Sequence, residues 1–271
     1  DASRTIRRCR LLSRPAIFFA NGIGDALMAL PGIRAALRAM PDATLITPTN
    51  PAYDFIFSGI EHRIRIPPQS GLEFDWKELD RRAGEPDRLA IFTSWSSVAL
   101  AEWTSVVNGR GYTSGLIGEA SRIAVSEGHY IRRYFEVARK IDPALRLEDH
   151  ILPLIDPADE PGLRGQEYYV LHLDTGAEKR LANSVWEGLV ASLEQHRPDL
   201  RPVVIGRDLM SERRLGGTLQ GVAHAPFDFA ACCKILAGAT FFAGVDSSFL
   251  HFADLQRIPA VGVFRTQNAE R

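Results

Sequence analysis

The chain has 271 residues, of which 45% are hydrophobic, and its formal net charge is −1. This length can bury one large core or two smaller ones. The near-neutral charge excludes a general electrostatic attraction to nucleic acid, so we expect no nucleic-acid partner. Cys9, Cys232 and Cys233 form no C-x-x-C pair, which suits a reducing cytoplasm. No segment approaches the ~20 consecutive apolar residues of a membrane-spanning helix.

The first predicted strand is the short apolar run Ala16–Ala20, which suits a strand buried on both faces. It leads into the turn Asn21-Gly22-Ile23-Gly24, after which Asp25 is expected to open a helix with apolar residues at helical spacing. Pro31 lies inside this pattern and should either kink the helix or begin a new first turn.

The middle of the chain alternates predicted strands and helices. The expected strands are Ala43–Pro48, Arg63–Pro67 and Leu89–Ser94, and the expected helices are Val98–Val107 and His129–Ile141. Prolines and acidic residues between Pro143 and Pro161 then mark a linker. We therefore divide the chain into two domains, 1–155 and 156–271. The second domain alternates in the same way, with strands Tyr168–Asp174 and Pro202–Gly206 and helices Val185–His196 and Phe227–Leu236.

A second strand-turn-helix site lies near the end of the chain. The apolar run Phe241–Val245 is followed by residues that start helices, and the strand Ala260–Phe264 completes a β-α-β unit. Such a unit requires a parallel sheet, whose binding crevice lies at the carboxyl ends of the strands. The helix start there carries Asp246, Ser247, Ser248 and His251, and its free N–H groups suit a phosphate. Two such sites predict an α/β protein with two Rossmann-like domains that face one cleft.

Several catalytic signatures are missing from the sequence. There is no P-loop and no G-x-S-x-G motif, no D-x-D pair, and no zinc spacing among the histidines. We therefore expect no metal site. Gly22-Ile23-Gly24 is only part of a dinucleotide fingerprint, and the strand Ala43–Pro48 ends in Thr49-Asn50 instead of the acid that would hold an NAD ribose. A nucleotide-dependent oxidoreductase is thus disfavoured but stays an alternative.

Three segments, in the order of the family, resemble glycosyltransferase family 9, the bacterial heptosyltransferases. They are NGIGDALMALPGIRAAL from residue 21, DTGAEKRLANSVWEGL from residue 174 and VDSSFLHFADLQRIPAVGVF from residue 245. The resemblance implies a GT-B arrangement, with 1–155 on the acceptor side and 156–271 binding the nucleotide sugar. It also implies metal-independent, inverting transfer of a heptose-like sugar, without a cofactor, from an ADP-heptose-like donor to an acceptor hydroxyl.

The resemblance places the family's catalytic aspartate at Asp25, which would take the proton of the acceptor hydroxyl. The residues alone equally allow a helix-capping role for Asp25. Lys179 falls on the family's phosphate-binding lysine, although Leu181-Ala182 replaces the usual Trp-Pro after it, and a solvated basic turn is the alternative. Positive charge there would stabilise the departing diphosphate.

The remaining site residues are expected to bind the donor. A capped helix with a packed histidine is the alternative for the last motif, and Glu212 is the rival of Asp208 as the ribose ligand. Ser248 and Arg265 stand where the family has glycine, which leaves open a non-catalytic nucleotide-sugar-binding module. The donor-binding set is Gly22, Gly24, Thr175, Gly176, Lys179, Arg180, Asp208, Asp246, Ser247, Ser248 and His251.

The expected partners are a nucleotide sugar and a saccharide or glycolipid acceptor, for which lipopolysaccharide core is the family default. Five arginines precede residue 15. Such a basic arm leaves open a peripheral contact with the anionic inner face of the membrane, although a merely solvated segment is the favoured alternative.

Overall fold

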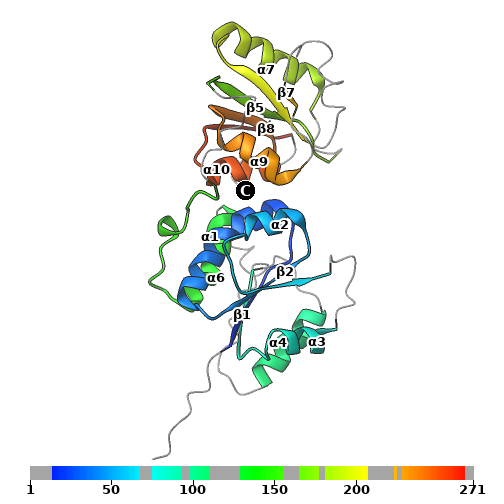
Figure 1. Cartoon of the computed structure of the whole chain (residues 1–271), viewed down its shortest axis with the longest axis vertical. Coiled ribbons are helices and arrows are strands. Elements are labelled where there is room, and N and C mark those ends of the chain that lie inside the picture. The colour runs from blue at the N-terminus through cyan, green and yellow to red at the C-terminus, as the bar shows by residue number, and fades with distance from the viewer. Residues whose placement is uncertain are drawn as a thin grey trace, which may run out of the picture.

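The computed structural model describes residues 14–67, 75–92, 98–109, 129–155, 165–176, 181–206, 223–224 and 228–265. These residues form two sheets whose strands all pair in parallel (Figure 1). The first sheet has the order β3-β2-β1-β4 and the second β7-β6-β5-β8-β9. Their bounds are β1 Pro15–Phe18, β2 Thr44–Pro48, β3 Arg63–Ile66, β4 Arg88–Ile91, β5 Tyr168–His172, β6 Arg201–Ile205, β7 Ala223–His224, β8 Phe241–Val245 and β9 Ala260–Val263.

Helices cover both faces of each sheet. From one end of the molecule to the other, the layers are α3 with α4, the first sheet, α1 with α2 and α6, then α9 with α10, the second sheet, and α7 (Figure 1). The bounds are α1 Ile23–Ala39, α2 Pro51–Ile56, α3 Trp76–Arg82, α4 Val98–Gly109, α6 Tyr130–Ile141, the 3-10 turn η1 Leu147–Asp149, α7 Asn183–His196, α9 Phe229–Ala237 and α10 Ser248–Leu255.

Strand β1 shows why the sequence folds in this way. Its side chains alternate between two buried faces: Ile17 belongs to the cluster under α1, whereas Phe18 packs edge-on against Trp103 of α4, with ring centroids 5.9 Å apart. A strand buried on both faces must be apolar at every position. The predicted apolar run at Ala16–Ala20 is therefore confirmed as a central strand.

The two halves of the chain share one apolar layer. Phe55 of α2 meets Phe229 of α9 with ring centroids 6.1 Å apart, and Phe229 stacks on Phe249 of α10 at 5.3 Å. The same buried cluster runs from Phe19 in the first half to Phe242 in the second sheet. Apolar burial of this kind is the main stabilising term in folding, so it fixes the inner faces of the two halves against each other.

The segment that crosses between the halves is held from both sides. Arg34 of α1 donates from Nη1 to the carbonyl of Leu152 at 2.7 Å. Gln256, directly after α10, donates from Nε2 to the carbonyl of Ile155 at 2.7 Å and accepts from the N–H of Leu154. The crossing chain thus has a defined path past the end of α10.

The predicted strands and the parallel α/β class are confirmed, with two differences in the first helix. Helix α1 begins at Ile23 and not at Asp25, because the carbonyl of Gly22 already accepts from the N–H of Ala26 at 3.0 Å. The helix also continues through Pro31, so a new first turn there is wrong. Packing of α1 on the sheet and on α6 holds the helix on both sides of this proline.

Two helices were not predicted, α2 and α3. Both have local start signals: the Asn50 side chain accepts from the N–H of Ala52 with Pro51 in the first turn, and Asp75 accepts from two N–H groups of α3. These are ordinary helix-capping patterns. In the part of the chain that the structure describes, no helix combines the length and apolar character that crossing a membrane requires. The division at residues 155 and 156 stays a prediction, and the two sheets lie on either side of it.

Candidate functional site

The N-terminus of α1 places Asp25 next to a buried tyrosine. The hydroxyl of Tyr134, on α6, donates to Oδ1 of Asp25 at 2.9 Å. Asp25 is half-buried and lies in the first helical turn, whereas the N-cap position belongs to Gly22, which has no side chain to cap with. Asp25 therefore does not occupy the cap position that was its structural alternative. Its other oxygen, Oδ2, lies on the side of Gly22, where an added Cβ would be 3.3 Å away.

Two further polar side chains support Tyr134. Asn21 donates from Nδ2 to the Tyr134 hydroxyl oxygen at 2.8 Å, and the hydroxyl of Tyr53 donates to the carbonyl of Asn21. Burial and the negative charge of Asp25 raise the pKa of Tyr53 well above its ordinary value. Tyr53 thus keeps its proton throughout the physiological range and acts only as a donor to this carbonyl.

The N-terminus of α10 faces the N-terminus of α1. A Cβ at Gly24 would be 3.2 Å from Cδ2 of His251 and 3.8 Å from Cα of Ser248. A side chain at Gly24 would therefore press on the histidine ring, and glycine allows the close approach of the two helices. The predicted base and the predicted donor-binding helix, far apart in the sequence, meet at this point.

His251 carries little positive charge at neutral pH. Burial lowers the pKa of its imidazole, the nearby carboxylate of Asp246 raises it, and the net shift is downward. Asp25 also acts on His251 through its negative charge. A neutral imidazole offers one N–H donor and one acceptor nitrogen, so His251 can bind a hydroxyl or a phosphate oxygen without adding a full charge.

The edge of the second sheet carries a histidine that the sequence analysis did not select. His172 ends β5, and its Nδ1 lies 3.1 Å from Oγ of Ser247. Burial lowers the pKa of His172 to about 4. Ser247 is the N-cap residue of α10, yet its side chain makes no capping hydrogen bond. The hydroxyl is held by His172, and the helix start has no side-chain cap that would compete with an anion for its N–H groups.

The structure brings most of the predicted residues to one place. Thr175 and Gly176 follow β5, which pairs with β8, so they lie at the same sheet edge as Ser247. Lys179, Arg180 and Asp208 lie outside the described residues. No group of three or more His, Cys, Asp or Glu side chains within the described ranges could hold a metal ion.

Among the described residues, Tyr134 and His172 are buried and contact predicted site residues, and the sequence analysis missed both. A signal for His172 was present, since a histidine interrupts the apolar run of β5 at its carboxyl end. Tyr134 carries no local signal, because it looks like any apolar position of an amphipathic helix.

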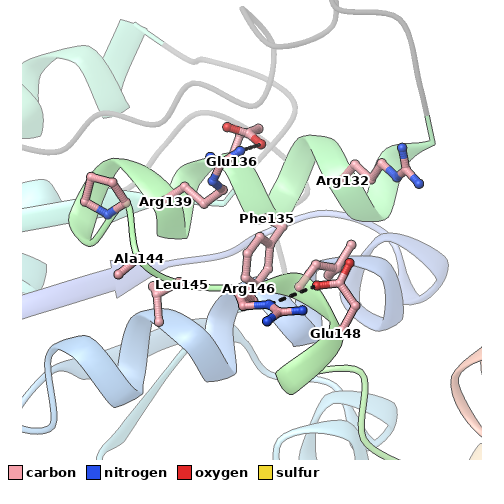
Figure 2. A pocket seen from close by; sticks show the side chains of 10 residues that line it. Arg132, Phe135, Glu136, Arg139, Ala144, Leu145, Arg146 and Glu148 are labelled. Atoms are coloured by element: carbon pink, nitrogen blue, oxygen red, sulfur yellow. Dashed lines mark hydrogen bonds and ion pairs between the residues drawn. The ribbon is translucent and has the colours of Figure 1, made fainter.

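An open groove of about 500 Å³ lies elsewhere, between α6 and the turn that contains η1 (Figure 2). None of the predicted site residues lines it. Two of its arginines are paired with acids of the same groove, Arg139 with Glu136 at 2.9 Å and Arg146 with Glu148 at 4.0 Å. Exposed pairs of this kind contribute little stability. The groove is therefore separate from the site around Asp25.

The two parallel sheets, packed together through two helical layers, form a GT-B type fold, as their neighbours among solved structures show. More particularly, the fold is similar to that of family 9 glycosyltransferases, among them heptosyltransferases, so the resemblance carried by the three motifs is confirmed at the level of the fold. No protein-family model matches the sequence, and no curated protein matches it.

Three solved structures document this likeness. The E. coli heptosyltransferase WaaC with ADP-2-deoxy-2-fluoro heptose shares 18% identity at a TM-score of 0.63, over 94% of this chain and 90% of that chain. The E. coli ADP-heptose lipopolysaccharide heptosyltransferase II shares 14% identity at a TM-score of 0.63, over 95% of this chain and 86% of that chain. The family 9 glycosyltransferase from Veillonella parvula shares 12% identity at a TM-score of 0.67, over 96% of this chain and 82% of that chain.

Proposed function

We propose that this protein is a metal-independent, inverting glycosyltransferase that transfers a heptose-like sugar from an ADP-activated donor to the hydroxyl of a saccharide or glycolipid. The reaction takes place in the cytoplasm, and a glycolipid acceptor would bring the enzyme to the inner face of the membrane. The fold neighbours WaaC and heptosyltransferase II, whose names refer to heptose transfer, support this choice of donor.

In the proposed reaction, Asp25 is the general base. Its Oδ2 takes the proton of the acceptor hydroxyl while that oxygen attacks the anomeric carbon from the face opposite the leaving group. The bond between the anomeric carbon and the diphosphate oxygen breaks, and its electron pair leaves with ADP. Lys179, Arg180 and the N–H groups at the start of α10 stabilise the negative charge that develops on the diphosphate.

One observation carries this proposal: the contact between the N-termini of α1 and α10 at Gly24, His251 and Ser248. It brings a carboxylate that can accept a proton next to a helix start that can bind an anion. The proposed inverting transfer uses both groups, one on each side of the anomeric carbon.

The direct test is ADP release from ADP-heptose, followed with and without a saccharide acceptor, in the wild type and in Asp25→Asn. We expect turnover in the wild type and a loss of at least ~10² in kcat for the variant, with donor affinity little changed, since the variant keeps the shape but not the basicity. Donor binding without turnover in the wild type would support a non-catalytic module instead. Near-normal turnover of Asp25→Asn would remove Asp25 from the chemistry.

A further inference from the structure

Tyr134 is a buried residue, 1% exposed, whose only hydroxyl proton points at the proposed catalytic carboxylate. Its oxygen accepts from Asn21 while its proton goes to Oδ1 of Asp25. A phenol has one proton to donate, so the bond from Asn21 fixes the direction in which that proton points. The carboxylate is thereby held at one oxygen, and Oδ2 is left on the side of the exposed Gly22.

The approach of α6 that places Tyr134 there depends on Gly32. A Cβ at Gly32 would lie 2.9 Å from the carbonyl oxygen of Tyr134 and 2.9 Å from Cε1 of Phe92. Real Cβ atoms do not approach other atoms this closely, so only glycine allows α6 to lie directly on α1 at this point. Gly32 lies seven positions after Asp25, on the same face of α1.

We propose that Tyr134 is a positioning residue for Asp25: its hydroxyl holds the carboxylate in the orientation that presents Oδ2 to the acceptor hydroxyl. Tyr134 does not reach the reacting atoms itself. It acts through Asp25, and Asn21 acts through Tyr134. This inference rests on the proposed function, because it assigns Tyr134 a part in the same proton transfer.

The test is a double-mutant cycle in turnover with ADP-heptose and an acceptor. Tyr134→Phe removes the hydroxyl and keeps the ring, so we expect kcat to fall about tenfold, as loss of a hydrogen bond to a charged acceptor allows, with the KM for donor unchanged. In the Asp25→Asn background the same substitution should have no further effect on kcat. A merely structural role would lower kcat by the same factor in both backgrounds.

Tyr169→Phe is the matched control. Tyr169 is also buried, at 1% exposed, and its hydroxyl has no hydrogen-bond partner among the described residues. The control should turn over like the wild type. Wild-type kcat in Tyr134→Phe, or equal losses in both backgrounds, would overturn the inference while Asp25 keeps its role. An inactive wild type would instead overturn the proposed function, and the inference with it.

Discussion

His172 predicts how the stability of the protein depends on pH. Its side chain is 5% exposed, and burial lowers its pKa to about 4, against 6.5 for a free imidazole. Between these two values the unfolded chain binds a proton that the folded protein does not bind, so a falling pH favours unfolding. The stabilisation due to the neutral His172 is complete above pH 6.5 and is lost as the pH falls toward 4.

The size of this loss in the free energy of unfolding follows from the width of the pH interval. From pH 6.5 to pH 5 the loss is about 1.4 kcal/mol per pH unit, which gives about 2 kcal/mol in the free energy of unfolding. This is a large part of the stability of an ordinary domain. His251 and His150 also have lowered pKa values, so they contribute to the pH dependence in the same direction.

The assay is urea unfolding at pH 7.5 and pH 5.0 for the wild type and for His172→Asn, whose amide can still bond to Ser247. The other histidines are the same in both proteins, so the difference between the two pH-dependent losses isolates His172. We expect the wild type to lose about 2 kcal/mol more than the variant on acidification. Equal losses in the two proteins would refute the assignment of a neutral, buried His172.

Three further outcomes are expected. Gly32→Ala should lower the free energy of unfolding by about 1–3 kcal/mol, because the added Cβ would clash with the backbone of α6. Urea unfolding would measure this loss beside the control Gly59→Ala, which adds a Cβ where the surrounding space is open. Lys179→Ala should weaken the binding of ADP far more than the binding of adenosine in calorimetric titration. Equal losses of affinity for the two ligands would show that Lys179 does not touch phosphate. Turnover should persist in excess EDTA, since the sequence offers no D-x-D pair; abolition by EDTA with rescue by Mg²⁺ or Mn²⁺ would contradict a metal-independent reaction.

Most of the strands were predictable because they are short apolar runs with turn signals beside them. The strand β7, Ala223–His224, was not predicted, because two residues cannot show a pattern. The edge at which Ser247 and His251 lie was also predictable, since a parallel sheet places the ends of its strands together. The contact between Tyr134 and Asp25 was not, because the two residues are 109 positions apart and α6 looks in the sequence like any amphipathic helix. The helix α2 was missed although Asn50 and Pro51 mark its start, because its apolar residues are too few to show a period.

The aromatic contact of Phe55 with Phe229 limits how freely the halves of this fold can be exchanged between related proteins. Each inner helical layer buries apolar side chains against the layer of the other half as well as against its own sheet. A chimera that joins the first half to a foreign second half must therefore also supply an aromatic surface that fits α2. Without that match, the apolar surface at the junction would be exposed to water and would favour association between chains over correct assembly within one chain. Recombination within such a fold would thus succeed only when the two inner layers are transferred together.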